Sequence, residues 1–349
     1  MKPEKERVRI VDIAEELGLS TATVSNVIHG KTKKISDKTV QRVQQLLEER
    51  QYIPSMAGIL LAQNDSKIIC VVINDHEKYE KRVLQDAFVV GSIDYLAEAI
   101  EETGFFMMIK KTNNIQDIIR YASMWNMAGL VLIGFCERDY EKLREKMHIP
   151  FVVYDGFVEK IDRYANISID HFAGGYQMGK YLLQMGHEKI LFAADNDESM
   201  DHERYLGLQQ AIKEHVGNSG MDATEAKLLL LPLQKEERML FYRKNMELIK
   251  RHTVLFCASD VYAIEVMNYL SDSGMKVPED ISIAGFDDIP ESTIVRPRLT
   301  TVRQDMEQRA RMTKEILRAW RDGTSFEQNI LLPVTVVERD SVKSIQKHS

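Results

Sequence analysis

Cysteine is scarce in this chain of 349 residues, and its three copies are widely separated. Cys70, Cys136 and Cys257 each lie in or at the end of an apolar segment. Their spacing matches no metal-binding pattern, so we expect buried, reduced thiols. The nine histidines contain no HExxH or paired-ligand pattern either. The sequence therefore predicts no metal site.

Long hydrophobic runs are also missing. The longest apolar stretches, such as Ile68–Ile73 and Gly129–Phe135, are far shorter than the roughly 20 residues that a membrane helix needs. The N-terminal sequence MKPEKERVRI contains no apolar stretch of the length found in signal peptides. These observations predict a cytoplasmic protein without a membrane segment.

The motifs of common enzyme classes are absent as well. No GxSxG, GxxxxGK[ST] or GxGxxG motif follows a predicted strand, and His, Cys and Asp form no evident cluster. Gly174 and Gly175 open a predicted helix without the context of a phosphate-binding loop, so we interpret them as packing glycines. We expect neither enzyme activity nor a cofactor.

Charge is distributed unevenly along the chain. The net charge is -7, which taken alone argues against a nucleic-acid partner. The first 63 residues, however, carry 10 Lys and Arg against 8 Asp and Glu, a net charge of +2, whereas the remainder carries -9. Any contact with DNA must therefore come from the N-terminal part, where basic residues cluster at Arg7, Arg9, Lys31, Lys33 and Lys34.

Three short amphipathic patterns begin the chain. They predict helices over Ile10–Leu17, Ser20–Ile28 and Thr39–Arg50. Gly18 suits the end of the first helix, and Ser20 suits the N-cap of the second. Two helices joined by a short glycine-containing turn are typical of a helix-turn-helix DNA-binding unit.

The second predicted helix has a small polar face opposite Val24 and Val27. That face can enter the major groove, and we expect base contacts from Thr21, Ala22 and Asn26. We expect backbone contacts from Ser20, Thr23, Ser25, His29 and Lys33. The alternative is that Ser20 and Thr23 only cap the helix and that the exposed face is simply solvated.

From Lys67 onward, apolar strands alternate with amphipathic helices in two successive series. The first series contains strands at Ile68–Ile73, Phe105–Ile109, Gly129–Phe135 and Phe151–Tyr154, and the second at Lys189–Ala194, Lys227–Leu231, Val254–Cys257 and Ile281–Phe286. This pattern predicts an α/β core of two lobes, each a doubly wound parallel sheet. Ligands bind beyond the carboxyl ends of the strands in such sheets.

Several segments resemble the lac repressor family (LacI/GalR). The headpiece segments are Val11–Ala14, Gly18–Ile28 and Ile35–Pro54, and the core segments are Asp170–Tyr176, Met185–Ile190, Glu203–Gly207, Val277–Asp288 and Leu299–Val302. The resemblance implies a helix-turn-helix headpiece on a core like that of periplasmic binding proteins. It implies a repressor of transcription that binds operator DNA and a small effector. It also assigns base reading to the positions of Thr21, Ala22 and Asn26.

The resemblance further implies a hinge helix over Ser55–Ala62, from which Leu61 enters the minor groove and kinks the operator. The alternative is that Leu60 and Leu61 pack the junction between domains. Gly58 stands where the family usually has alanine, and glycine costs about 1 kcal/mol of helix propensity relative to alanine. We therefore expect this hinge helix to fold less readily.

For the effector, the family places an arginine and an aspartate at the positions of Arg204 and Asp287. Their chemistry suits a sugar, because guanidinium groups and carboxylates bind hydroxyl groups. The alternatives are a surface ion pair of Arg204 with Glu203 or Asp201, and a loop cap for Asp287. Three more residues at strand ends complete the predicted effector site, namely Asp75, Asp155 and Ser259. Ser259 stands where asparagine is frequent, and Asp260 is expected to cap its helix.

The predicted domains are a headpiece over 1–52, a hinge over 53–65 and a core over 66–349. The first lobe is expected at about 66–164 plus 304–333, and the second at about 165–303 plus 334–341. The family's end pattern leaves only the residues after Ser341, too few for a tetramerising coiled coil. We therefore expect a homodimer on a pseudo-palindromic operator.

Two other functions share parts of this pattern. A sugar-binding protein of a transporter has the same two-lobed fold, but the segment Val11–Leu61 argues against it. The core could also bind a partner protein in place of a metabolite, and the sequence leaves this alternative open.

Overall fold

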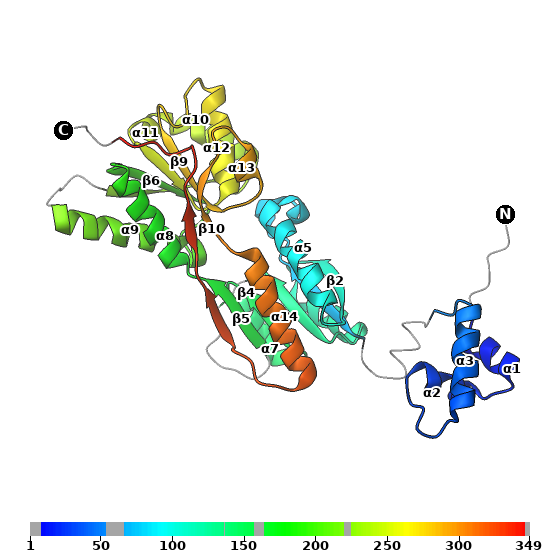
Figure 1. Ribbon diagram of the computed structural model, residues 1–349. Coiled ribbons are helices and arrows are strands. Elements are labelled where there is room, and N and C mark those ends of the chain that lie inside the picture. Colours follow the sequence, from blue (N-terminus) through cyan, green and yellow to red (C-terminus); the bar gives the residue numbers. More distant parts are fainter. Residues whose placement is uncertain (1–7, 54–65, 136, 157–163, 220–224, 346–349) are drawn as a thin grey trace, which may run out of the picture. The chain divides into compact units, whose positions relative to one another are not determined.

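The computed structural model of the chain describes residues 8–53, 66–135, 137–156, 164–219 and 225–345. It consists of two compact units, Met1–Ser66 and Lys67–Ser349 (Figure 1). The predicted hinge helix, with Leu61 and Gly58, lies outside the described residues. Across the described ranges, no helix combines the length and the apolarity needed to cross a membrane.

The N-terminal unit contains the three predicted helices, α1 (Ile10–Leu17), α2 (Thr21–Ile28) and α3 (Asp37–Glu49). Gly18 ends α1 in the left-handed conformation with φ 66°, which glycine adopts without strain. The Ser20 hydroxyl then caps α2 by accepting the backbone N–H of Thr23 at 3.1 Å. The helices enclose a small core of Ile13, Ala14, Val24, Val27, Val43 and Leu46.

The first lobe of the core is built on a six-stranded parallel sheet. Its spatial order is β11 (Asn329–Leu332), β5 (Tyr164–Ile169), β4 (Phe151–Tyr154), β3 (Gly129–Ile133), β1 (Ile68–Ile73) and β2 (Phe106–Lys111). One face packs against α5 (Ala87–Glu101) and α14 (Met306–Asp322). The other face packs against α6 (Ile115–Met124) and α7 (Glu137–Lys146). Both faces are therefore covered, as continuous apolar strands predict.

The second lobe repeats this plan. Its sheet has the order β12 (Thr335–Val337), β10 (Thr300–Arg303), β9 (Ser282–Asp287), β8 (Val254–Cys257), β6 (Lys189–Ala194) and β7 (Glu225–Leu230), with β12 antiparallel to β10. One face is covered by α8 (His171–Gln184) and α9 (Ser199–Ser219). The other is covered by α10 (Lys235–Lys244), α11 (Met246–Lys250) and α12 (Asp260–Asp272). A short helix, α13 (Glu291–Ile294), follows β9.

The chain crosses between the lobes after β5, after β10 and after β11. The expected lobe boundary at 164/165 is therefore wrong by one strand, because β5 pairs with β4 and β11 in the first sheet. The boundary lies after Ile169. The two later crossings agree with the expected changes of lobe near 304 and 334.

Helices α8 and α9 pack very closely. A Cβ atom on Gly175 would lie 1.9 Å from the Arg204 carbonyl oxygen, and one on Gly207 would lie 2.1 Å from the Phe172 carbonyl oxygen. Gly174 likewise leaves room for the Phe286 ring. The prediction that Gly174 and Gly175 are packing glycines is confirmed, and their packing places Arg204 next to the start of α8.

Candidate functional site

Helix α2 presents the side chains predicted to read DNA. Thr21, Ala22 and Asn26 are exposed, whereas Val24 and Val27 are buried against the other two helices. A helix that packs against its own domain on one side and presents a small polar face on the other is suited to insertion into a major groove.

The residues expected at the DNA backbone have mixed surroundings. Ser20 and Thr23 pair through their hydroxyl groups at 2.8 Å, in addition to the N-cap bond. Ser25 is half-buried, His29 is the C-cap residue of α2, and Lys33 is exposed in the loop that follows. Ser20 therefore does cap α2, as the alternative interpretation predicted. A capping hydroxyl at the start of a helix can also contact a phosphate, so a backbone contact from Ser20 stays a prediction.

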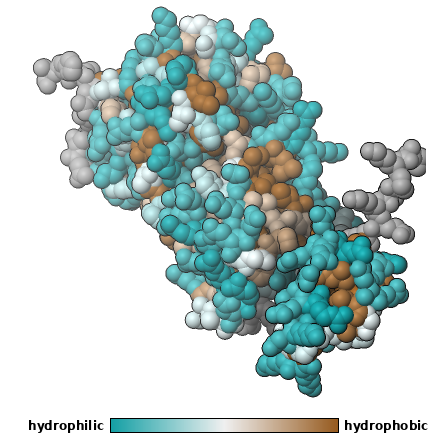
Figure 2. Space-filling model, turned by 45° about the vertical axis from the view of Figure 1, so that its right-hand side comes forward, coloured by the Kyte–Doolittle hydropathy of each residue, from teal (hydrophilic) through white to brown (hydrophobic). Residues whose placement is uncertain are grey.

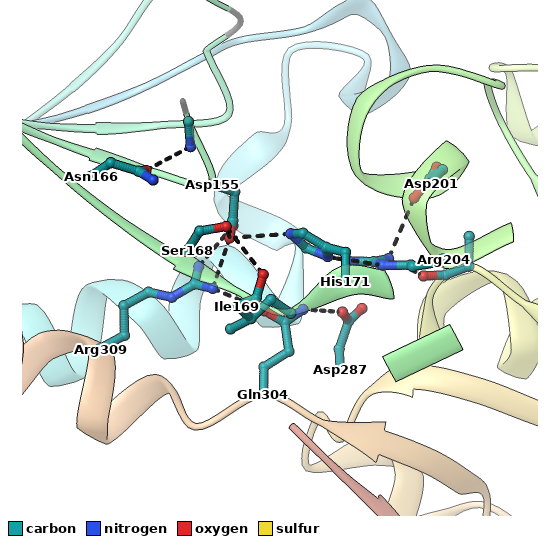
Figure 3. A network of polar contacts seen from close by, with 12 residues as sticks. Asp155, Asn166, Ser168, Ile169, His171, Asp201, Arg204, Asp287, Gln304 and Arg309 are labelled. Carbon is teal, nitrogen blue, oxygen red and sulfur yellow. Dashed lines mark hydrogen bonds and ion pairs between the residues drawn. The ribbon is translucent and has the colours of Figure 1, made fainter. Parts of the chain in front are cut away.

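In the core, Arg204 is almost completely buried and has several partners. Its Nη1 lies 3.4 Å from Asp201 Oδ1 and also donates to the Ala258 carbonyl oxygen. Its guanidinium carbon lies 3.8 Å from the centre of the Phe286 ring. The predicted alternative, an ion pair with Asp201, exists, but it is buried and not on the helix surface. Arg204 is therefore fixed in position as a planar donor (Figure 3).

His171 connects Arg204 with Asp155. Arg204 donates from Nε and Nη2 to His171 Nδ1 at 3.3 and 3.2 Å, so Nδ1 is the acceptor and the proton lies on Nε2. Nε2 faces Asp155 Oδ1 at 3.4 Å. Burial lowers the pKa of His171, and the ring is therefore neutral at pH 7.

Asp155 follows β4 and forms a bidentate ion pair with Arg309 of α14, with N–O distances of 2.8 and 2.9 Å. Burial by itself raises the pKa of this carboxyl group, but Arg309 and His171 more than offset burial and hold the pKa well below its usual range. Asp155 also has positive φ, 55°, which is uncommon for a residue other than glycine. The carboxylate is thus held charged at the end of its strand.

Asp287 ends β9 in an unusual conformation with φ 126°. It is buried, and Gln304 donates from Nε2 to Asp287 Oδ1 at 2.5 Å. Burial raises the pKa of Asp287 well above its usual range, although Arg204 and Gln304 oppose this effect. Backbone strain of about 1–3 kcal/mol is typical of residues held for a function.

Asp75, the second residue after β1, pairs with Lys111 Nζ at 3.5 Å. Its Oδ1 atom is buried, as is Oδ1 of the adjacent Asn74, and neither oxygen accepts a hydrogen bond from any described residue. Asn74 is oriented by a bond from its Nδ2 to the Gly134 carbonyl oxygen at 2.8 Å. Buried acceptors without donors are rare and point to a missing hydrogen-bond partner.

Ser259 is the N-cap of α12 and accepts the N–H of Tyr262 at 3.4 Å. The expectation that Asp260 caps this helix is wrong. Asp260 is fully buried and accepts from Ile289 N, Ser292 Oγ and Thr301 Oγ1. Its carboxylate ties α12 to β10 and α13, because three donors from distant segments converge on it.

Sequence reasoning missed His171, Gln304 and Arg309. Gln304 follows the carboxyl end of β10 and would have been a candidate had that strand been recognised. Arg309 lies within α14 and His171 at the first position of α8, where neither periodicity nor a strand end distinguishes them. Together with Asp155, Arg204 and Asp287, they form one polar network at the crossings between lobes (Figure 3).

Comparisons with known proteins agree with this architecture. Residues 9–55 match the sequence model of bacterial regulatory proteins of the lacI family, and residues 180–342 match the periplasmic binding protein-like domain. The HTH-type transcriptional repressor PurR of Vibrio atlanticus (strain LGP32) is 28% identical over 347 residues, covering 96% of this chain and 99% of that protein. The HTH-type transcriptional regulator MalR of Clostridium butyricum is 25% identical over 353 residues, covering 97% and 100%.

Among solved structures, the lac repressor dimer bound to operator and the anti-inducer ONPF gives a TM-score of 0.79 at 21% identity, covering 97% of this chain and all of that chain (100%). The CelR–cellobiose complex gives a TM-score of 0.68 at 21% identity, covering 96% and 100%. These likenesses show a shared fold over nearly the whole chain. The chain belongs to the lacI family of bacterial regulatory proteins and is a DNA-binding transcriptional regulator with a two-lobed core, not an enzyme.

Proposed function

We propose that this chain is a repressor that binds a pseudo-palindromic operator as a homodimer in the cytoplasm. Its operator affinity is controlled by a small polyhydroxylated effector bound between the lobes. Thr21, Ala22 and Asn26 read bases, and Ser20, Thr23, Ser25, His29 and Lys33 contact the DNA backbone. A hinge over 53–65 connects the reader to the core and places Leu61 in the minor groove.

The effector site is supported best by the two unpartnered acceptor oxygens of Asn74 and Asp75. Buried acceptors require donors, and the hydroxyl groups of a sugar supply them. The fixed carboxylate of Asp155 and the carboxyl oxygens of Asp287 would accept further hydroxyl hydrogen bonds, while Arg204 and Ser259 would donate. Sugar ligands occur in similar structures, namely cellobiose in CelR and ribose in a LacI-family regulator from Enterococcus faecium.

A homodimer is supported by an exposed apolar face on the first lobe. Figure 2 shows hydrophobic side chains at the surface on the side of the core where α5 lies. The large apolar side chains exposed on η2 (Val83–Gln85), α5 and β2 are Leu84, Val90, Tyr95, Phe106 and Ile109. Apolar patches of this kind mark interaction surfaces, and β2 is an edge strand. We call this set the α5–β2 face.

A gel-shift experiment on DNA upstream of the coding sequence, with and without a panel of sugars and nucleobases, tests this function. We expect a shifted complex whose affinity changes with a neutral sugar. Arg204→Ala should abolish the effector response and leave operator binding in place. A response retained in Arg204→Ala would move the effector site elsewhere. Failure to prefer any duplex over random competitor DNA, with every metabolite tried, would refute the proposal.

A further inference from the structure

An ion pair joins the two lobes away from the segments in which the chain crosses from one lobe to the other. Lys78 lies in the 3-10 helix η1 (Glu77–Tyr79) of the first lobe, and Asp195 follows β6 of the second. Lys78 Nζ lies 3.3 Å from Asp195 Oδ2. The polar network of Figure 3, in contrast, includes His171 and Gln304, which lie in the crossing segments themselves. The Lys78–Asp195 contact is therefore one that a rotation of the lobes could break.

The Lys78 side of this contact is firmly placed. The segment between β1 and α5 is anchored by Val83, which is fully buried. His76 Nδ1 accepts the backbone N–H of Lys78 at 3.2 Å, and Lys111 donates from Nζ to the Lys81 carbonyl oxygen at 2.5 Å. Glu80 and Lys81 both have positive φ, which turns the chain sharply after η1. The fold of this segment thus carries the Lys78 side chain to the second lobe.

The Asp195 side is fixed more rigidly still. Its side chain is 2% exposed. Tyr262 donates its hydroxyl to Oδ2 at 2.6 Å, and Asn196 donates from Nδ2 to Oδ1 at 2.6 Å. Tyr262 belongs to α12, and its ring lies 5.1 Å from the guanidinium of Arg238, which pairs with Glu265 at 2.7 Å. Tyr262 and Asn196 therefore orient the Asp195 carboxylate independently of Lys78.

Both partners are charged at neutral pH. Burial lowers the pKa of the Lys78 ammonium, but Tyr79, Asp195 and Asp201 more than offset burial and raise the pKa above its ordinary value. Burial raises the pKa of Asp195, but Lys78 and Tyr262 hold it below its ordinary value. Water screens a charged pair in this partly dry position less than it screens one on the surface.

We propose that the Lys78–Asp195 ion pair, oriented by Tyr262, holds the two lobes in the arrangement seen here and thereby sets how readily they change arrangement. This conformational role stands by itself. Its regulatory consequence, that Lys78 sets the coupling between effector and operator, rests on the proposed function.

The distance between the lobes tests this role in the full chain. Spin labels at Glu101 of α5 and Lys213 of α9, both exposed, report that distance by double electron–electron resonance. Cys136 is replaced by serine, and labelled chains are diluted with unlabelled ones so that only distances within one chain are counted. The variants are Lys78→Met, Asp195→Asn and their combination, and the control is Lys81→Met, an exposed lysine of the same segment.

We expect one main distance in the parent and in Lys81→Met. Lys78→Met and Asp195→Asn should each add a second, different distance population, and the double variant should add no more than either single change. A Lys78→Met distribution identical to the parent would overturn the proposal, as would the same change in Lys81→Met or additive effects of the two substitutions. The measurement contains neither operator nor effector. A negative result would therefore overturn the role of the Lys78–Asp195 ion pair without bearing on the proposed function.

Discussion

Two exposed residues of the headpiece, Asn26 and Lys33, differ in what they can offer to DNA. Asn26 lies on the outer face of α2 and can pair with an adenine edge in bidentate fashion. Lys33 lies beyond the helix and can only neutralise phosphate charge. Their substitution by alanine should therefore have different signatures.

Asn26→Ala should relax sequence preference by about 1–3 kcal/mol at one base pair with little change in the salt dependence of binding. Lys33→Ala should weaken all sequences alike and reduce the salt slope by about 1. Binding titrations on operator variants at several salt concentrations measure both effects. Identical effects of the two substitutions would disprove the assignment of α2 as the base-reading helix.

Asp201 next to Arg204 gives a pH-dependent contribution to stability. Burial raises the pKa of Asp201 to about 6, against the pull of Arg204. A carboxyl group whose folded pKa exceeds its unfolded value stabilises the fold fully below the unfolded pKa, near 4, and loses this contribution as pH rises through the folded pKa.

Asp201→Asn removes the titrating carboxyl group and with it this pH-dependent loss of stability. Between about pH 4 and pH 6 the unfolding free energy of the parent should fall relative to that of the variant. Urea unfolding at a series of pH values measures the difference. Asp197→Asn is the control, because Asp197 is exposed in the segment just before α9 and pairs with His202 at the surface. A parent and a variant with parallel pH profiles would contradict the buried, raised-pKa state of Asp201.

At the scale of elements, the close approach of α8 and α9 positions Arg204 and His171 of the polar network, next to the proposed effector site. Two glycines allow it, one on each helix, because a side chain on either would meet the backbone of the other helix. Arg204 lies on α9 and His171 on α8, so their contact depends on this spacing. A change in the spacing should therefore affect stability and the site together.

Gly207→Ala places a Cβ atom 2.1 Å from the Phe172 carbonyl oxygen, so the helices must separate. We expect the free energy of unfolding to fall by about 1–3 kcal/mol, as at other overpacked positions. Gly217→Ala is a matched control on the same helix, since its Cβ would meet nothing within 4 Å. That change should be neutral or stabilise by up to about 1 kcal/mol. Equal effects of the two changes would contradict the close packing.

At the scale of the whole molecule, the α5–β2 face should determine assembly. Phe106 on β2 is 57% exposed, and a lysine there would place a charge within an apolar interface. We expect Phe106→Lys to sediment as a monomer and to bind a two-half-site operator at least about tenfold more weakly, because the two headpieces no longer bind as one unit. Effector binding should remain.

Leu240→Lys provides the comparison, because Leu240 is 59% exposed on α10, away from that face. It should leave both the sedimentation coefficient and operator affinity unchanged. Monomers in Leu240→Lys, or dimers in Phe106→Lys, would place the dimer interface elsewhere.

The sequence by itself determined the local elements of this protein. Helical periodicity and capping residues such as Ser20 specified the headpiece helices within about two residues, and continuous apolar runs specified the central strands of both sheets, because these signals depend on neighbours along the chain. Strand ends also pointed to Asp75, Asp155 and Asp287.

Tertiary structure alone decided the rest. Strands β5, β10, β11 and β12 are short or weakly patterned, and their sheets are set by pairing with strands far away in the sequence. Contacts between distant parts of the chain likewise bring Arg309 to Asp155, His171 to Arg204 and Lys78 to Asp195. The partners in these contacts are separated by many residues along the chain, and their energies depend on burial and distance, which no local pattern encodes.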